Sequence, residues 1–453
     1  MTNNIDSLNE GLFGEYCSLT LQQSITSSAT VDPSLFPSEP VVGFPGPTPT
    51  GLEPAAIQTA PTYPYNNGPA NQFPLIAPQP HADYGLPDAS PLIPEGCNII
   101  QMHLLYRHGA RCPTSGAAPS TFAQKLYNAT RDGGFRTYKL GAELLSPFCR
   151  SQNFNLEIAY RQLYGELLNN FTEAGTLLVF RTESQDRMVK TAENFAAGFF
   201  GVPDPGANNS GAPYEVCTNS NVESRGSIGS TVATTYASSA FNSKIARLQS
   251  QLQLCSYETH ALGYSKFCTL FSEEDFLTYD NGPSSPVSAA QEKGYLQEWV
   301  ARLTHSFPSA TSALNKTFDK STTFFPLHNS IYADATHEVV ILDTLTAFNL
   351  SALFKGPPLD PKGNEHNNAF VASMQVPFVM HFTTQVLVCP AYTPTRQIHS
   401  YSGCSENSSG LCSLDTVISA LQKMIAEIVY DYDCFSNYTA NAGIDYNGRA
   451  PRS

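Results

Sequence analysis

Residues 98–111 read Asn-Ile-Ile-Gln-Met-His-Leu-Leu-Tyr-Arg-His-Gly-Ala-Arg, and this stretch decides the fold. Its first part, residues 98–106, is a mostly apolar run of strand length that ends directly on Arg107 and His108. Buried central strands of α/β sheets have this pattern, and ligands of such sheets bind at the carboxyl ends of the strands. The sequence therefore predicts a functional site immediately after a buried strand.

A second strand-and-helix unit follows in residues 175–195. Residues 175–181 have the pattern of a strand, and residues 187–195 have that of a helix with one apolar face. The apolar positions recur at three- and four-residue spacing, at Met188, Ala192, Phe195 and Phe199. Arg187 falls in the first turn of this helix, where the positive end of the helix dipole favours an anion.

The C-terminal half returns to the same alternation. Residues 330–334 indicate a strand that leads to His337 and Glu338, and a helix is expected over 338–348. A strand over 380–389 and a last helix over 414–430 follow. These elements predict an α/β fold with a central mixed sheet flanked by helices.

The chain divides into three regions. Residues 1–93 form a proline-rich tail, which we expect to be disordered because proline removes backbone donors and favours extended chain. The α/β catalytic domain is expected in residues 94–205 and 325–453. Residues 206–324, which carry a Gly-, Asn- and Ser-rich stretch and then helical patterns, are expected to form a mainly helical insertion.

Composition narrows the class of protein. The chain has 453 residues, of which only 14% are charged, and its formal net charge is −14. This charge argues against nucleic acid or an anionic membrane as the partner, although a local cluster of arginines can still bind a small anion. No apolar run reaches the length of a membrane-spanning helix.

Cysteines and glycosylation sequons indicate an oxidising compartment. The 11 cysteines show no paired Cys-x-x-Cys spacing, which favours long-range disulfides over a zinc site. Asn-x-Ser/Thr sequons occur at Asn128, Asn170, Asn208, Asn315, Asn349, Asn407 and Asn437. We therefore expect a secreted protein. The sequence from Met1 to Asp6 shows no leader, and a misassigned start is favoured over a removed leader or unconventional export.

Residues 107–113 could bind and attack a phosphate monoester. A phosphate dianion needs planar donors and positive charge, and Arg107 and Arg111 provide guanidinium groups on either side of His108. Gly109 permits close approach of the backbone or a positive φ, and Pro113 ends regular structure. The alternative is a surface arginine turn beside a structural histidine, which the preceding apolar strand argues against.

The pair His337-Glu338 offers an imidazole beside a carboxyl group. Next to phosphate, a carboxylic acid can keep its proton at acidic pH and donate it to a departing alkoxide. Taken alone, the pair would be better explained as a buried histidine beside a helix-capping acid. A metalloprotease motif is excluded, because no second histidine follows at the required spacing.

Together these pieces resemble the histidine acid phosphatase family, in its fungal, phytase-like branch. The resemblance covers residues 94–436. It is carried by the R-H-G-x-R-x-P segment at 107–113, the Arg187-x-x-x-Thr-Ala helix start, the pair at 337–338, and a cysteine loop at 404–412. It implies a phosphoglycerate-mutase-like fold and an acid phosphomonoesterase, with inositol phosphates among its substrates and no metal or cofactor.

The resemblance also assigns roles to residues. His108 would be the nucleophile that becomes phosphohistidine, and Glu338 would protonate the leaving oxygen and then assist water. Arg107, Arg111, Arg187 and His337 would bind the phosphoryl oxygens. The surrounding arginines should depress the pKa of His108 and keep it neutral at acidic pH. The other histidines, such as His103, His305 and His381, are expected to be structural.

The family pattern implies the disulfides Cys404–Cys412, Cys255–Cys268, Cys217–Cys434 and Cys97–Cys389. A Cys112–Cys149 pair is a further option, and Cys17 has no assigned partner.

Two features depart from the family pattern. The usual acid after the second histidine is Asp, whereas this chain has Glu338, which is one methylene longer. The loop 114–120 contains no lysine, which favours a broad specificity over adaptation to phytate.

Two alternatives remain open at this point. One is an intracellular mutase or phosphatase of the wider phosphohistidine superfamily, against which the cysteines and sequons argue. The other is a binding protein for phosphates or sugar phosphates on the same fold, with its chemistry weakened at Glu338. The sequence leaves the oligomeric state open.

Overall fold

A computed structural model gives the fold of the chain. It describes residues 93–111, 144–145, 147–176, 178–200, 208–210, 216–228, 285–309, 311–315, 317–350, 376, 378–389, 397–399, 411–441, 444 and 446–452. The proline-rich tail, the loop 114–120 and most of the expected helical insertion lie outside these residues, so the division into three regions remains a prediction.

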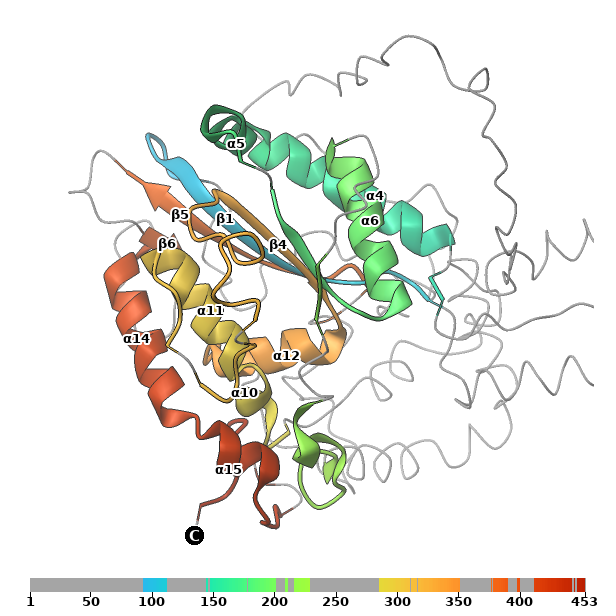
Figure 1. Cartoon of the computed structure of the whole chain (residues 1–453), viewed down its shortest axis with the longest axis vertical. Helices are drawn as coiled ribbons and strands as arrows, with labels where there is room; N and C mark the ends of the chain where they lie inside the picture. Colours follow the sequence, from blue (N-terminus) through green and yellow to red (C-terminus); the bar gives the residue numbers. More distant parts are fainter. Residues whose placement is uncertain are drawn as a thin grey trace, which may run out of the picture.

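A seven-stranded mixed sheet forms the centre of the molecule, in the order β3-β2-β4-β1-β5-β6-β7 (Figure 1). Its strands are β1 (Asn98–Arg107), β2 (Phe180–Glu183), β3 (Asn208–Ser210), β4 (Ile331–Thr336), β5 (His381–Val388), β6 (Gln397–His399) and β7 (Leu411–Ser413). The first four strands pair in parallel, whereas β5 lies antiparallel to β1. The expected α/β class with a mixed sheet is confirmed.

Helices cover both faces of the sheet (Figure 1). One group consists of α4 (Pro147–Tyr164), η4 (Gly165–Leu167), α5 (Leu168–Ala174) and α6 (Asp186–Phe200). The other consists of α10 (Ser288–Gln291), α11 (Lys293–Thr304), α12 (Glu338–Ala347), α14 (Leu414–Glu427) and α15 (Tyr430–Phe435). A short helix, η5 (Thr218–Asn221), packs near α15.

The sequence of strand β1 is mostly apolar because the sheet is covered on both faces. Side chains alternate between the two faces of a strand, and both faces of β1 are covered. Met102, Leu104 and Tyr106 face α4 and α6, in one buried cluster with Phe195. Leu105 belongs to a cluster on the other face, beside α12. A strand that is buried on both sides loses the polar alternation of a surface strand.

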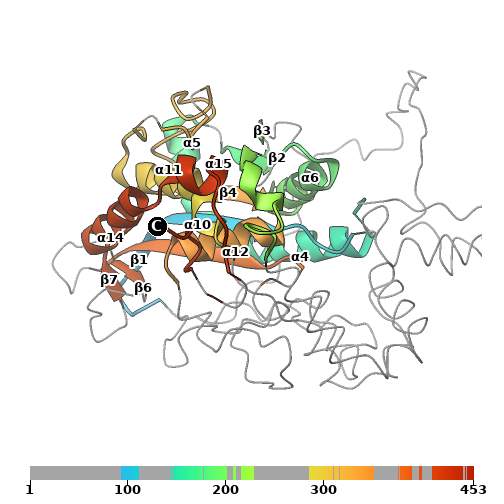
Figure 2. The same cartoon turned by 90° about the horizontal axis from the view of Figure 1, so that it is seen from below.

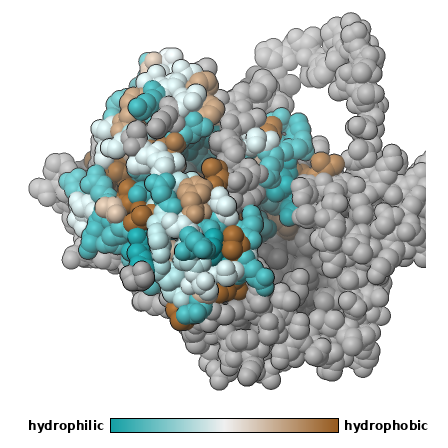
Figure 3. Space-filling view, turned by 60° about the horizontal axis from the view of Figure 1, so that its bottom comes forward, coloured by the Kyte–Doolittle hydropathy of each residue, from teal (hydrophilic) through white to brown (hydrophobic). Residues whose placement is uncertain are grey.

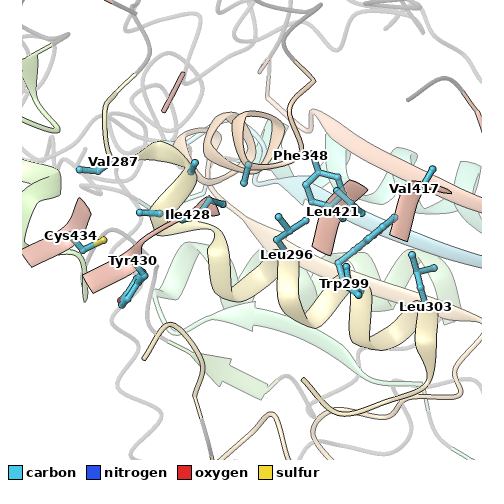
Figure 4. Packing of buried hydrophobic residues seen from close by; sticks show 14 of the residues in the cluster. Val287, Leu296, Trp299, Leu303, Phe348, Val417, Leu421, Ile428, Tyr430 and Cys434 are labelled. Atoms are coloured by element: carbon cyan, nitrogen blue, oxygen red, sulfur yellow. The ribbon is translucent and has the colours of Figure 1, made fainter. Parts of the chain in front are cut away.

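The largest buried cluster lies between α11, α12 and α14 (Figure 4). Trp299 belongs to this cluster, with its ring 5.0 Å from that of Phe348, in an edge-on arrangement. Leu296 and Leu421 are completely buried beside it. Aromatic pairs of this kind add roughly 0.5–1.5 kcal/mol to the burial of their apolar area. This cluster holds α11 and α14 against each other on the sheet.

The second predicted strand begins later than expected. Residues 175–181 were expected to be extended, but β2 starts only at Phe180. Gly175 has a φ of 62°, and the backbone N–H of Thr176 donates to the carbonyl of Phe171 at 3.0 Å. This is a helix-terminating turn, which glycine favours. These residues therefore complete the C-terminus of α5 before the strand can begin.

The register of the parallel strands places their carboxyl ends together (Figure 2). Arg107, the last residue of β1, lies beside Thr336 of β4, and Thr182 of β2 lies beside Ala335. The chain therefore leaves β1, β2 and β4 at one edge of the sheet. That edge carries the predicted site residues.

Two disulfides agree with the family pattern. Cys97 is bonded to Cys389, and Cys217 is bonded to Cys434. Cys412 is also disulfide-bonded, to a partner outside the described residues. The expected Cys255–Cys268 bond and the cysteines at 17, 112 and 404 lie outside the described part of the chain.

One face of the molecule is mainly hydrophilic (Figure 3). On the face shown in Figure 3, hydrophilic and near-neutral residues predominate, and hydrophobic residues occur in small scattered groups. Among the described residues, no helix combines the length and apolar character that crossing a membrane would require.

Candidate active site

His108 follows β1 directly and is fully buried. Its Nδ1 atom lies 2.7 Å from the carbonyl oxygen of Gly109. A carbonyl only accepts hydrogen bonds, so this contact places the proton on Nδ1 and leaves the lone pair of the neutral ring on Nε2. Nε2 lies 3.8 Å from Oε2 of Glu338. His108 therefore presents an unprotonated ring nitrogen next to a carboxyl group.

The protonation of His108 also suits a nucleophile. Burial lowers the pKa of His108 well below its usual value, and the Arg107 cation lowers it further. The sequence predicted the depressed pKa but attributed it to arginines, whereas burial is the larger cause. A neutral imidazole at acidic pH is the form that can attack.

Gly109 is required for close packing. A Cβ atom at this position would lie 2.7 Å from Sγ of Cys149 and 3.0 Å from the Cys149 backbone, on α4. The N–H of Ala110 donates to Oε1 of Gln152, also on α4, at 2.9 Å. Gly109 is not among the described glycines with positive φ. Of the two reasons suggested by the sequence, close approach is therefore the one that applies.

Arg107 is held from several directions. Its Nη2 atom lies 3.2 Å from Oε2 of Glu338, and Nη1 donates to the carbonyl of Val376. The ring of Phe378 lies 4.4 Å from the guanidinium carbon, a cation–π distance. Burial lowers the pKa of Arg107, Glu338 opposes this, and Arg111 adds to the lowering. The effect of Arg111 indicates that its charge acts on the same site.

Residues 379 and 380 hold the motif in place. The N–H of Val379 donates to the carbonyl of His108 at 3.2 Å, and the N–H of Arg107 donates to the carbonyl of Met380 at 2.8 Å. Val379 has a φ of 55°, which is rare for a β-branched residue. Strain of this kind, of order 1–3 kcal/mol, persists where surrounding structure enforces it. No sequence pattern indicated this segment before the strand expected over 380–389.

Glu338 begins α12, with His337 as its N-cap. Its side chain is 37% exposed, and Oε2 points to Arg107. Burial alone would raise its pKa, but the Arg107 cation holds the pKa of Glu338 well below its usual range. Without a substrate, Glu338 is therefore a carboxylate. Glu338 lies in the first turn of α12, and the side chain of the N-cap residue His337 makes no capping hydrogen bond.

His337 is buried and lies edge-on to His108, with ring centroids 5.4 Å apart. Its Nε2 atom is 2.9 Å from Oε2 of Glu183, the last residue of β2. Glu183 was not among the site residues expected from the sequence. Its position at the end of a strand, as with Arg107, is the signal that could have identified it.

Arg187 lies in the first turn of α6, which begins shortly after β2 ends, as predicted. The structure thus brings Arg107, His108, His337 and Glu338 into contact, with Arg111 close by, while Arg187 joins the same edge from α6. His103, predicted to be structural, is buried between the rings of Trp299 and Tyr332.

Comparison with known proteins gives the family. The model of the histidine phosphatase superfamily (branch 2) matches residues 98–243 and 232–401. The chain is 25% identical to Phytase A of Neurospora crassa over 444 residues, which covers 74% of this chain and 87% of that protein. It is 27% identical to Phytase A of Arthroderma benhamiae over 400 residues, covering 73% and 85%.

A solved structure supports the fold. The crystal structure of the phytase from D. castellii matches with a TM-score of 0.59 and 17% identity, over 83% of this chain and 89% of that one. Since the family model spans more than half of the chain and the curated relatives match most of its length, this chain belongs to the histidine phosphatase superfamily, branch 2, as a phytase-like histidine acid phosphatase.

Proposed function

We propose that the chain hydrolyses phosphate monoesters at acidic pH through a phosphohistidine intermediate. The observation that carries the proposal is the position of His108. Its Nδ1 is engaged by the carbonyl of Gly109, so Nε2 keeps a lone pair beside Glu338 and Arg107. Nucleophile, acid and cation thus meet at one point, as covalent phosphoryl transfer requires.

The reaction proceeds in two steps. In the first, Nε2 of His108 attacks phosphorus, the bond to the ester oxygen breaks, and Glu338 gives its proton to the departing alkoxide. In the second, Glu338 takes a proton from water, the water oxygen bonds to phosphorus, and the N–P bond breaks. Arg107, Arg111, Arg187 and His337 bind the phosphoryl oxygens throughout, which stabilises their developing charge.

Inositol phosphates are proposed as one substrate group among several. The support is the similarity to proteins named Phytase A. The absence of lysine from residues 114–120 favours broad specificity, because a substrate with many phosphates gains from extra cations. Comparing kcat/KM for phytate, glycerophosphate and nucleotides tests this point. A marked preference for phytate would contradict broad specificity.

Hydrolysis of p-nitrophenyl phosphate at pH 3–6 tests the proposed chemistry. The wild-type protein should hydrolyse this ester, and His108→Ala should lose activity by several orders of magnitude. Acid quenching during turnover should trap a phosphorylated histidine in the wild-type protein alone. His328→Ala is the matched control, since that imidazole is exposed and lies before β4 at the opposite edge. Phosphate binding without turnover in wild type would instead favour the binding-protein alternative.

Secretion is the proposed location. Two described disulfides and the seven sequons support an oxidising compartment. Expression of the full chain in a eukaryotic host tests the proposal: the protein should appear in the medium and shift in mass after enzymatic deglycosylation. Retention in the cytosol without sugar would contradict it.

A further inference from the structure

We propose that Glu183 is a positioning residue that holds His337 for phosphate binding and supplies the negative charge beside it. The proposal rests on the proposed function, and it adds a residue that neither the motifs nor the expected roles include. It is carried by the contact between the buried side chains of Glu183 and His337.

The carboxylate of Glu183 is fixed at both oxygens. Oε2 lies 2.9 Å from Nε2 of His337, and Oε1 accepts a hydrogen bond from the hydroxyl of Thr336 at 2.5 Å. Thr336 ends β4, and the register of β2 with β4 brings Glu183 alongside it. Two neighbouring parallel strands therefore set the position of Glu183.

This arrangement determines what His337 can donate. A carboxylate attracts positive charge and accepts hydrogen bonds, so Oε2 of Glu183 favours a His337 ring oriented with Nε2 toward it. In this orientation Nδ1, on the other side of the ring, is the nitrogen that could donate to a phosphoryl oxygen. Donation to an anion is favoured when the ring has an acidic partner inside the protein.

Glu183 is suited to be that partner. Among the described residues, the titratable groups around His337 include His108, which follows β1, Glu338 from α12 and Glu183 from β2. Glu338 is already paired with Arg107. Glu292, which would repel Glu183 if it were charged, is neutral, because burial raises its pKa well above the usual value. Glu183 is thus the carboxylate in direct contact with His337.

A double-mutant cycle in the full chain tests the proposal. Glu183→Gln keeps the shape but removes the charge, and it should weaken inorganic phosphate binding by about tenfold or more, with a matching loss in kcat/KM. In a His337→Asn background the same substitution should cost little, because Glu183 acts through His337. Glu157→Gln, another buried glutamate in α4, is the matched control and should leave phosphate binding unchanged.

The outcomes distinguish the role of Glu183 from the proposed hydrolysis of phosphate esters. An equal loss from Glu183→Gln in both backgrounds, or no loss in either, would overturn the role of Glu183 whether or not esters are hydrolysed. Calorimetric titration with inorganic phosphate gives this result even for an inactive protein. Failure of wild type to hydrolyse any ester would instead reject the proposed function and leave the binding cycle as the test of Glu183.

Discussion

The Nη2 atom of Arg107 lies 3.2 Å from Oε2 of Glu338. This ion pair keeps Glu338 ionised in the free protein, because the cation outweighs the effect of burial on its pKa. A general acid must carry a proton, so Glu338 can act only if the substrate changes this balance. The phosphoryl group does so in two ways, since it competes for Arg107 and brings negative charge of its own.

We predict that anion binding at about pH 5 is accompanied by proton uptake. The pKa of Glu338 is depressed in the free site, and a bound dianion should raise it through the working pH, so the site gains a proton. Sulfate is the suitable probe, because it mimics phosphate but does not titrate in this range. Calorimetry in buffers of different ionisation enthalpy measures the uptake.

Glu338→Gln provides the control for this measurement. The variant should bind sulfate without taking up a proton. It should also slow esters with poor leaving groups far more than aryl phosphates, which need little protonation. Wild type that binds sulfate with no proton uptake would show that Glu338 stays ionised and is not the acid.

Gly109→Ala should destabilise the protein by roughly 1–3 kcal/mol, because its Cβ would overlap α4. The overlap is with Sγ of Cys149 at 2.7 Å, so Cys149→Ala in the same chain should recover part of the loss. Gly165→Ala is the control, since its Cβ would meet only Arg161 at 3.7 Å or more. Urea unfolding measures the free energy of unfolding of the wild type, the two single glycine variants and the double variant. A Gly109→Ala variant as stable as wild type would show that the helix can move away.

The protein should be more stable near pH 4.5 than at pH 8. Burial raises the pKa of Glu157 to about 10 and that of Asp343 to about 8. A carboxyl group whose pKa is raised in the folded state contributes its full stabilisation at pH values below the pKa that it has in the unfolded chain. This contribution falls as the pH rises toward the pKa of the folded state. Below about pH 4 the ion-paired Asp334, whose pKa is lowered, acts in the opposite direction.

Urea midpoints between pH 3 and pH 9 check this profile. Glu157→Gln replaces a neutral carboxyl group by a neutral amide, so it should flatten the decline above pH 5. Stability that rises steadily from pH 5 to pH 9 would contradict the assignment of buried neutral carboxyl groups.

Phe378→Leu should weaken phosphate binding by a few fold. Its ring lies over the Arg107 guanidinium, and a desolvated contact of this type contributes up to about 2 kcal/mol. Leucine keeps the apolar volume but offers no π face. Phe382→Leu, in β5, is the control, since its ring packs on Phe348 in the core. Equal phosphate affinities for both variants would show that the ring acts only by filling space.

Local pattern was enough to predict the main elements. The strand before Arg107, the helix that carries Arg187 and the helix that begins at Glu338 all follow from residue spacing, and the structure contains them. The contact between Glu183 and His337 could not be predicted, because it depends on the pairing of two strands distant in sequence. The left-handed backbone of Val379 has no sequence signal either, since tertiary contacts impose it.

The two described disulfides have a consequence for proteolysis. Cys97–Cys389 and Cys217–Cys434 enclose overlapping stretches of chain. A single cut anywhere between Cys97 and Cys434 therefore leaves two fragments that remain one covalent molecule. Removal of the whole stretch from 229 to 284 by two cuts would still leave the flanking parts joined by both bonds. A nicked enzyme would migrate as a single band until it is reduced, so cleavage and loss of activity need not coincide.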